Sequence, residues 1–204
     1  MEQTVSPILS PSPEKPIKKI GVIKSIFKEI FIFALIAFFV VLPFRMFVAE
    51  PYIVDGISMD PTFHTGDYLI VNKLSYEIGT PKRNTVIVIK FPLNPSKKFI
   101  KRMIGLPGDT IEIDGNTVRI TNKENPKGFV IDHSYLVHKV PDSPHFSLKK
   151  TLGPEEYFVM GDNRKESYDS RYWGVLPKAD IVGIPILRLF PFTQIGILPG
   201  DDRK

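Results

Sequence analysis

One long apolar run stands out near the start of the chain. From Ile30 to Ala49 the residues are almost all apolar, and Arg45 is the one charged residue among them. As a helix, these 20 residues would extend roughly 30 Å, which matches the hydrocarbon core of a bilayer. We therefore predict one membrane-spanning helix within residues 21–49, with Arg45 close to the interface.

From residue 50 onward the pattern changes to short β-rich runs separated by Gly, Pro and Asp turns. These residues, 50–204, are predicted to form one mainly β domain of curled antiparallel sheets or a partly closed barrel. Asp114-Gly115-Asn116 is predicted to be a hairpin turn. The predicted strands are Pro51–Val54, Asp67–Asn72, Thr85–Phe91, Lys98–Ile104, Thr110–Ile113, Thr117–Ile120, Tyr157–Met160 and Ile181–Leu189.

The residues before the apolar run predict how the chain is oriented. Residues 1–20 are polar, contain four prolines and are predicted to be a disordered tail. Five lysines precede the run, so the positive-inside rule places the tail in the cytoplasm and residues 50–204 outside. A cleaved signal peptide would also begin with basic residues, but Phe47 would occupy the −3 position of a cut after Ala49. A buried core helix would show a polar stripe, which this run lacks.

Composition excludes several classes of function. The chain has no cysteine, which rules out disulfides, thiolate metal sites and a cysteine nucleophile. Its four histidines have no metal-ligand spacing and are interpreted as ordinary surface or core residues, so we expect no metal and no cofactor. The net charge of +5 accompanies no nucleic-acid motif, and a lipid surface is the expected anionic partner. Residues 121–156 are polar and are assigned no chemistry.

A serine in a turn and a lysine on a strand are the first candidates for chemistry. Ser58 lies in the turn Asp55–Thr62, where a serine is equally typical of a simple turn former. Period-2 alternation places Lys101 on the same strand face as Phe99 and Met103. Such a lysine is either an edge-strand residue in water or a desolvated amine whose pKa is lowered by burial. A desolvated amine can act as a general base near neutral pH.

The segment Gly161–Gly174 carries a dense set of polar side chains. If the segment is extended, Ser167, Asp169 and Arg171 share one face, where Asp169 and Arg171 could pair and Ser167 could bond a nearby amine. An exposed loop would have the same composition. No histidine accompanies Ser58 at a suggestive position, so a Ser-Lys pair is the remaining nucleophile and base arrangement.

Four segments of the chain, taken in order, resemble the conserved boxes of the type I signal peptidases, or leader peptidases, which are serine proteases with a Ser-Lys dyad. The boxes are GISMDPT at 56–62, GDYLIVNKLSY at 66–76, KRMIGLPGD at 101–109 and GDNRKESYDSRYWG at 161–174. Together with the predicted anchor they cover most of the chain.

The resemblance implies a role for each matching residue. Ser58 would be the nucleophile and Lys101 the general base. Ser167 would orient the lysine amine. Structural support would come from Arg102, Asp169 and Arg171.

The resemblance departs from some family members at Gly56. In those members a serine two residues before the nucleophile completes the oxyanion hole with its hydroxyl. Here the Ser58 backbone N–H would still donate. The second donor would then be a backbone group or water.

By the same resemblance the protein would be a membrane-bound endopeptidase that removes signal peptides from exported pre-proteins after small residues, in an Ala-x-Ala pattern. The substrate would lie extended, as an added strand, with shallow pockets near Tyr52, Val54 and Ile100. The apolar stretch Leu187–Phe192 would either touch lipid or form a core strand.

Three other functions remain as alternatives. A self-cleaving repressor-type protease would need a DNA-binding domain, which residues 1–49 do not offer. An inert, signal-peptidase-like assembly factor would be expected to lack Ser58 or Lys101. A membrane-tethered binding module would be distinguished by its failure to cleave a pre-protein.

Overall fold

The structure is a computed structural model, which describes residues 19–42, 48–74, 79, 81–131 and 146–200. Outside the described residues lie most of the predicted tail, positions 43–47 of the predicted anchor, and His133, His138 and His145. The chain divides into two compact units, Met1–Pro43 and Phe44–Lys204.

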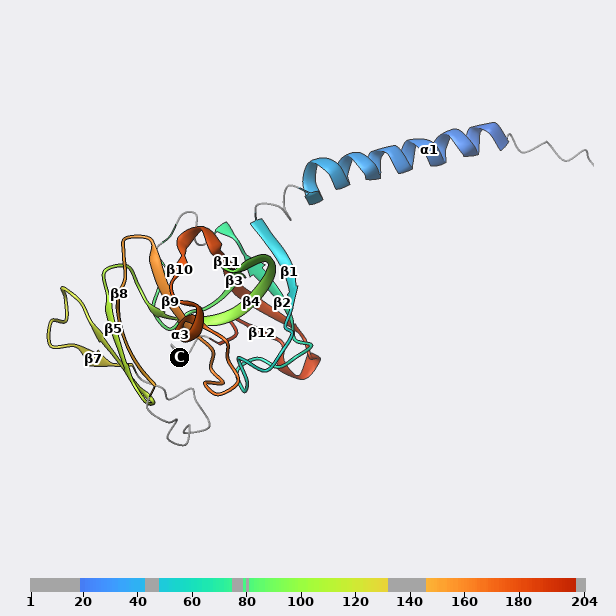
Figure 1. Cartoon of the computed structure of the whole chain (residues 1–204). Helices are drawn as coiled ribbons and strands as arrows, with labels where there is room; N and C mark the ends of the chain where they lie inside the picture. Colours follow the sequence, from blue (N-terminus) through green and yellow to red (C-terminus); the bar gives the residue numbers. More distant parts are fainter. Residues whose placement is uncertain (1–18, 43–47, 75–78, 80, 132–145, 201–204) are drawn as a thin grey trace, which may run out of the picture. The chain divides into compact units, whose positions relative to one another are not determined.

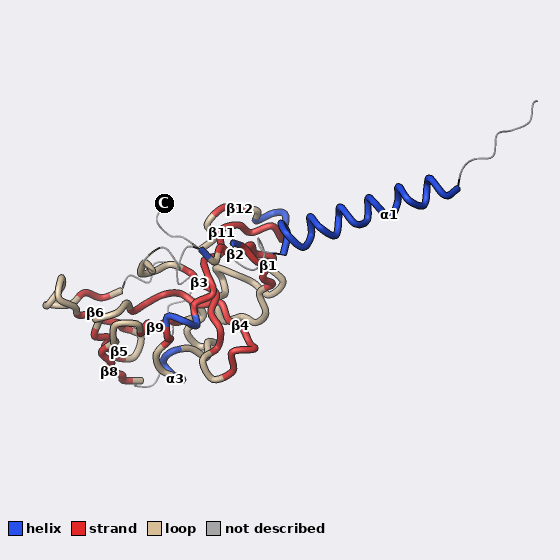
Figure 2. The backbone as a smooth tube through the Cα atoms, turned by 90° about the horizontal axis from the view of Figure 1, so that it is seen from above, coloured by secondary structure: helices blue, strands red, loops and turns tan. Residues whose placement is uncertain are grey.

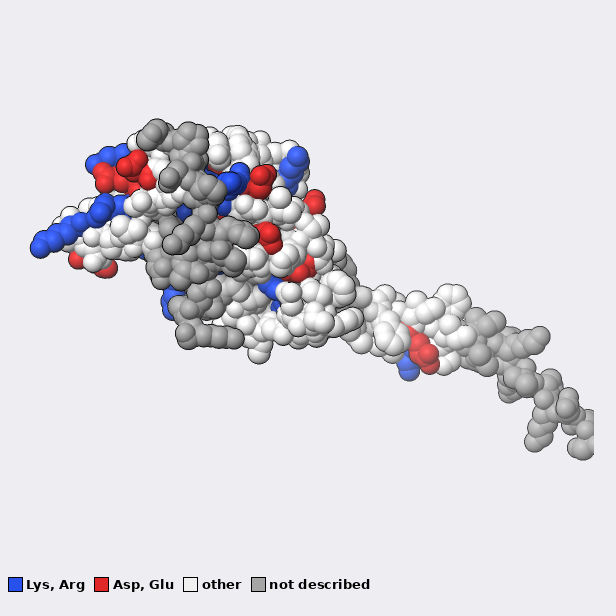
Figure 3. Space-filling view, turned by 90° about the horizontal axis from the view of Figure 1, so that it is seen from below, with Lys and Arg blue, Asp and Glu red and all other residues white. Residues whose placement is uncertain are grey.

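The first unit is helical. Helix α1 (Lys19–Ile36) continues into a π-helical turn, η1 (Ala37–Val41). From residue 25 on, its side chains are exposed and largely apolar, and most of this surface is uncoloured in Figure 3. Among the described residues, no helix combines the length and the apolar character needed to cross a membrane. The membrane span predicted within 21–49 therefore stays a prediction.

An antiparallel sheet of eight strands dominates the second unit (Figure 1). Along this sheet the order is β1-β2-β11-β3-β4-β9-β10, with β12 paired to β11. Its strands are β1 (Ala49–Ile53), β2 (Tyr68–Asn72), β3 (Val86–Phe91), β4 (Asn94–Gly105), β9 (Glu156–Met160), β10 (Leu176–Pro177), β11 (Ile181–Phe190) and β12 (Gly196–Ile197).

The large sheet curls until its first strand meets β4 (Figure 2). Lys98 Nζ of β4 lies 2.5 Å from Glu50 Oε1 of β1, and the Tyr52 hydroxyl donates to the Lys98 carbonyl at 3.4 Å. These contacts skip β2, β11 and β3, which separate the two strands in the sheet order. The predicted mainly β, antiparallel class is confirmed. The sheet does not form a closed barrel, because among the described strands the ends β1 and β10 do not pair.

A second sheet has four strands in the order β7-β6-β5-β8. Strands β5 (Thr110–Asp114) and β6 (Thr117–Thr121) form the predicted hairpin, in which Asp114 pairs with Thr117. Strands β7 (Phe129–Val130) and β8 (Ser147–Thr151) lie within residues 121–156, for which the sequence predicted no structure.

Two of the buried clusters position the functional residues. One joins the small sheet to β4 and β9, and contains Ile104, Ile111, Ile120 and Phe158. The other lies beneath the Ser58 turn and contains Met59, Phe63, Val54 and Ile100, among others. Because Met59 and Phe63 are both fully buried, the turn that carries Ser58 is fixed on the protein core.

Candidate active site

Ser58 lies in a short turn that follows β1. Gly56 has a φ of +94°, a left-handed conformation that glycine adopts without strain. Backbone bonds within the turn run from Asp60 N to the Ile57 carbonyl at 3.2 Å and from Phe63 N to the Met59 carbonyl at 3.0 Å. The turn thus presents a half-buried serine at the surface of a rigid loop.

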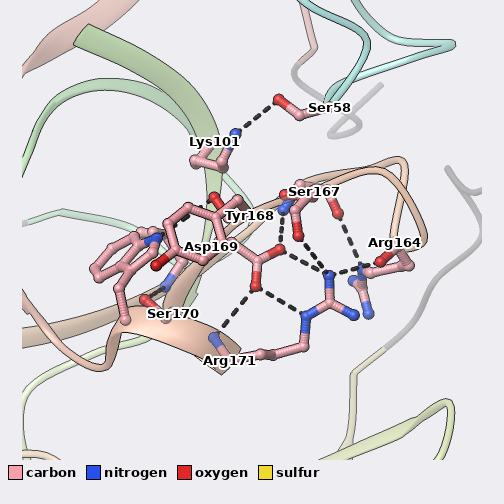
Figure 4. A network of polar contacts seen from close by, with 11 residues as sticks. Ser58, Lys101, Arg164, Ser167, Tyr168, Asp169, Ser170 and Arg171 are labelled. Atoms are coloured by element: carbon pink, nitrogen blue, oxygen red, sulfur yellow. Dashed lines mark hydrogen bonds and ion pairs between the residues drawn. The ribbon is translucent and has the colours of Figure 1, made fainter. Parts of the chain in front are cut away.

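Lys101 extends from β4 toward this serine (Figure 4). Its Nζ lies 2.7 Å from Ser58 Oγ and 3.1 Å from the Ile100 carbonyl oxygen. The residue is only 3% exposed, and its amine lies 5.3 Å from the centre of the Phe99 ring. An edge-strand lysine in water does not fit this burial, whereas a desolvated amine does.

Burial lowers the pKa of Lys101 from its ordinary value of 10.5 to about 8. The carboxylates of Asp169 and Asp162 oppose this shift, and the Arg171 guanidinium adds to it. At pH 7 a pKa of about 8 leaves roughly one amine in eleven neutral, against about one in 3,000 at 10.5. The site therefore holds a usable base beside a hydroxyl, which is the arrangement needed for nucleophilic catalysis.

Arg102, the residue after the candidate base, is fully buried and forms the centre of a polar network. Its Nε and Nη2 donate to the two carboxylate oxygens of Asp162 at 2.8 and 2.7 Å. Its Nη1 donates to the Asn84 carbonyl at 2.7 Å and to the Gly200 carbonyl at 3.0 Å. Arg102 thus connects β4 to three other parts of the chain, and its predicted role as structural support of the site stays a prediction.

Asp162, which pairs with Arg102, also binds the loop that carries Ser58, called the nucleophile loop below. Thr62 Oγ1 donates to Asp162 Oδ2 at 2.6 Å, and the neighbouring Asn163 N–H donates to the Ser58 carbonyl at 3.0 Å. Sequence reasoning assigned no role to Asp162, Thr62 or Asn163. All three lie within the quoted boxes, but their partners lie 60 or more positions away along the chain, so the sequence did not show what they contact.

Asp169 and Arg171 form the predicted pair, but by a different geometry from the one predicted. The segment is not extended at this point: residues Ser170–Trp173 form a short helix, α3, and Asp169 caps its N-terminus. Asp169 Oδ1 accepts from Arg171 Nε at 2.8 Å, while Oδ2 accepts from Arg171 Nη2 at 2.9 Å and from the Gly161 N–H at 3.0 Å. Aspartate is a strong cap because its carboxylate satisfies free helix N–H groups. Figure 4 shows this carboxylate beside the Arg171 guanidinium.

Ser167 lies beside the dyad without bonding to it. The residue is 3% exposed, and within the described residues its hydroxyl has no hydrogen-bond partner. A Cβ at residue 161 would approach both Ser167 Oγ and the Ser58 carbonyl oxygen closer than 3.0 Å, so only glycine fits between them. The predicted bond from Ser167 to the Lys101 amine is not formed in this structure, and its orienting role stays a prediction.

The backbone around Gly56 and Ser58 is open. A Cβ at Gly56 would meet nothing within 4 Å, and no bond from the Ser58 N–H is formed within the described part of the chain. That N–H is therefore not used by the described backbone, and its role as an oxyanion donor stays a prediction. A second donor is not identified.

The three predicted substrate-binding residues lie together. Val54 and Ile100 are 1% and 3% exposed in one cluster, and the half-buried Tyr52 packs against it. Burial and the nearby Asp55 raise the pKa of Tyr52 to about 12, so its hydroxyl stays protonated. Within the described ranges, no group of three or more His, Asp or Glu side chains could hold a metal ion, and the expected independence of metal stays a prediction.

Comparison with known proteins supports a single family. Residues 24–190 match the family model of signal peptidase, peptidase S26. A signal peptidase I from Bacillus caldolyticus is 37% identical over 164 residues, covering 78% of this chain and 89% of that protein. Signal peptidase I P of Bacillus subtilis subsp. natto is 40% identical over 172 residues, covering 79% and 88%.

A solved signal peptidase I from Enterococcus faecalis V583 is 33% identical with a TM-score of 0.44, covering 52% of this chain and 97% of that one. The family match and the two relatives leave one assignment. The chain belongs to the signal peptidase family, peptidase S26, and is a serine peptidase.

Proposed function

We propose that this protein is a membrane-bound endopeptidase that removes N-terminal signal peptides from exported pre-proteins, cutting after small residues in an Ala-x-Ala pattern with a Ser58–Lys101 dyad. One observation carries this proposal: Lys101 Nζ lies 2.7 Å from Ser58 Oγ although Lys101 is 3% exposed. A hydroxyl and a desolvated amine at hydrogen-bond distance are what a Ser-Lys protease needs.

The reaction begins when the neutral amine of Lys101 takes the proton of the Ser58 hydroxyl. Ser58 Oγ then attacks the carbonyl carbon of the residue at −1, and the Ser58 N–H donates to the oxyanion. As the C–N bond breaks, the Lys101 ammonium returns a proton to the leaving amine. Lys101 then takes a proton from water, whose oxygen attacks the acyl carbonyl carbon. The bond to Ser58 Oγ breaks, the Lys101 ammonium returns the proton to Ser58 Oγ, and the signal peptide is released as a carboxylic acid.

Ser167 and the ion pairs serve this chemistry indirectly. The Ser167 hydroxyl, which has no partner among the described residues, lies near the Ser58 backbone and would orient the amine once a substrate excludes water. Arg102 with Asp162, and Arg171 with Asp169, fix the strand and the loop on either side of the dyad.

The substrate enters as an extended strand. Strand β1 has a free edge in the described sheet order, and β4 pairs with β9 only from Arg102 onward. A peptide between these edges would pass Tyr52, Val54 and Ile100 before it reaches Ser58. Because Val54 and Ile100 are already buried in the core, little depth remains for a side chain, which favours small residues at −1 and −3.

Membrane attachment follows from the apolar run Ile30–Ala49 and the lysines that precede it. The N-terminus would be cytoplasmic and the catalytic unit extracytoplasmic. Phe190 and Phe192, at 48% and 78% exposure, would touch lipid. An anchor confines the dyad to the surface where signal peptides emerge, which raises their effective concentration.

The cleavage reaction itself tests this function. We expect the full chain in vesicles to cut a test pre-protein after alanine at −1, and a matched pre-protein with phenylalanine at −1 at least about 100-fold more slowly. The rate should be the same with and without EDTA. Cleavage at unrelated positions, equal rates for the two substrates, or a loss of activity in EDTA would contradict the proposal.

The rate is expected to rise with pH. Since only neutral Lys101 can act as base and its pKa is about 8, kcat/KM should increase about tenfold per pH unit below pH 8 and level off above it. Initial rates between pH 5 and pH 10, on enzyme shown to remain folded throughout, would measure this rise in kcat/KM below pH 8, which we call the acid limb. A profile that is flat across this range would rule out a lysine base.

A further inference from the structure

The segment Leu198–Gly200 reaches Arg102, the residue after the candidate base, although it lies far along the chain from Ser58 and Lys101. It follows β12, which pairs with β11, and the Leu198 N–H donates to the Ile186 carbonyl at 2.9 Å. Two residues later, the Gly200 carbonyl accepts from Arg102 Nη1 at 3.0 Å. The segment therefore ends on the residue next to the catalytic base.

Gly200 fits its place closely. Its φ is +80°, a backbone angle that residues with a side chain rarely adopt. A Cβ there would lie 2.9 Å from Phe63 Cε2, 2.9 Å from Val86 Cγ2 and 3.2 Å from Thr62 Cγ2. Only a residue without a side chain can bring its carbonyl to Arg102 at this point.

These neighbours come from both halves of the active site. Phe63 and Thr62 belong to the loop that carries Ser58, and Phe63 is fully buried beneath it. Val86 is paired with Arg102 across strands β3 and β4. Thr62 and Arg102 also share the Asp162 carboxylate as a partner. Gly200 thus touches the nucleophile loop on one side and the base strand on the other.

We propose that Gly200 is a positioning residue for the reaction: docked in this crevice, it holds the Ser58 loop against the strand of Lys101 and keeps water away from the buried Arg102. This role rests on the Ser-Lys mechanism proposed above. It gives a positioning role to Leu198–Gly200, a segment that lies outside the four boxes of the sequence analysis.

Displacing Gly200 has two consequences that a general loss of stability would not produce. The Ser58 loop gains freedom relative to Lys101, which lowers kcat more than it changes KM, because misplacement by about 1 Å can cost 100-fold in rate. Because Ser58 Oγ lies 2.7 Å from Lys101 Nζ, a loosened Ser58 loop also lets water reach the Lys101 amine. Desolvation is the main cause of the low pKa of Lys101, so its pKa moves from about 8 toward 10.5. Its charged neighbours Asp162, Asp169 and Arg171 remain in place.

A matched pair of substitutions in the same segment tests the role. Gly200→Ala introduces the clashing Cβ, whereas at Gly196 the nearest atom to a Cβ is 3.8 Å away. In the full chain in vesicles, we expect Gly200→Ala to lower kcat for the test pre-protein about 10- to 100-fold with KM within about twofold. The acid limb of kcat/KM should shift to higher pH. Gly196→Ala should match the wild type in both.

A deletion of residues 199–204 removes the carbonyl without adding a side chain, and we expect the same two changes. The proposal is overturned if both variants keep the kcat and the acid limb of Gly196→Ala. It is also overturned if kcat falls only in proportion to the folded fraction, measured by thermal unfolding, while the limb stays in place. Ser58→Ala serves as the reference. If Ser58→Ala still cleaves, the dyad itself is wrong; if it is inactive while the Gly200 variants are normal, only the positioning role is lost.

Discussion

Replacing Ser58 by alanine, or Lys101 by alanine or methionine, is expected to abolish processing, with a fall in kcat/KM of at least about 10⁴-fold. The loss is expected because in the proposed mechanism Ser58 Oγ and Lys101 Nζ, 2.7 Å apart, act as one unit in both chemical steps. Methionine retains most of the volume and apolar contacts of the lysine stem, so Lys101→Met separates the loss of the amine from a loss of packing. Rates of pre-protein cleavage, with circular dichroism as a check on folding, would measure the effect.

Matched controls lie on the same elements or on exposed strands. Lys97 is an exposed residue of β4, and Ser147 is an exposed residue of β8, so Lys97→Met and Ser147→Ala should keep wild-type activity. The double variant Ser58→Ala/Lys101→Met should be no slower than either single variant, since both remove the same unit. Normal cleavage by any of the dyad variants would discard the mechanism.

Among the substitutions proposed in this section, Asp162→Ala is expected to lower the free energy of unfolding the most. Asp162→Ala leaves the guanidinium of Arg102 buried without its carboxylate and removes the acceptor of Thr62, at a cost of about 3–5 kcal/mol in the free energy of unfolding. Urea unfolding of the full chain in detergent micelles, followed by Trp173 fluorescence, would measure this. Cleavage activity should fall with it, because the same carboxylate connects the nucleophile loop to β4.

Two comparisons make the Asp162 result specific. Glu112 forms an ion pair with Lys149 on the exposed face of the small sheet, and Glu112→Ala should leave the free energy of unfolding nearly unchanged. The double replacement Arg102→Leu/Asp162→Leu should destabilise less than Asp162→Ala alone, because it leaves no uncompensated charge. Equal stability of Asp162→Ala and Glu112→Ala would show that the buried pair does not have the predicted importance.

The sequence predicted the strands that have a clear apolar signature. In β3 (Val86–Phe91) and β11 (Ile181–Phe190), runs of β-branched residues coincide with burial. Strand β8 was missed because Ser147–Thr151 is polar and only Leu148 in it is partly buried, so no alternation stands out. Strands β7, β10 and β12 have two residues each, too few for any periodicity.

The candidate active site likewise contains residues that the sequence pointed to and residues that only the structure reveals. The position of Lys101 between Phe99 and Met103 on one strand face made burial one of two possibilities, because that pattern depends on neighbours in the sequence, and the structure decides between them. Its partner Ser58 was found through the resemblance of the boxes, since a serine in a turn has no signature of its own. The contacts of Asp162 and Gly200 with Arg102 bridge 60 and 98 positions, and only the folded sheet brings these residues together.

The free edge of β1 has a consequence for how copies of this protein behave toward one another. An unpaired strand is a template for any other strand, and confinement to a membrane plane would bring many such templates together. Pro51, in the middle of β1, has no N–H to offer an intruding strand, and the Glu50–Lys98 pair places charges at one end of the gap. The edge at which we propose that the signal peptide docks is therefore one that discourages two copies of the protein from pairing through β1.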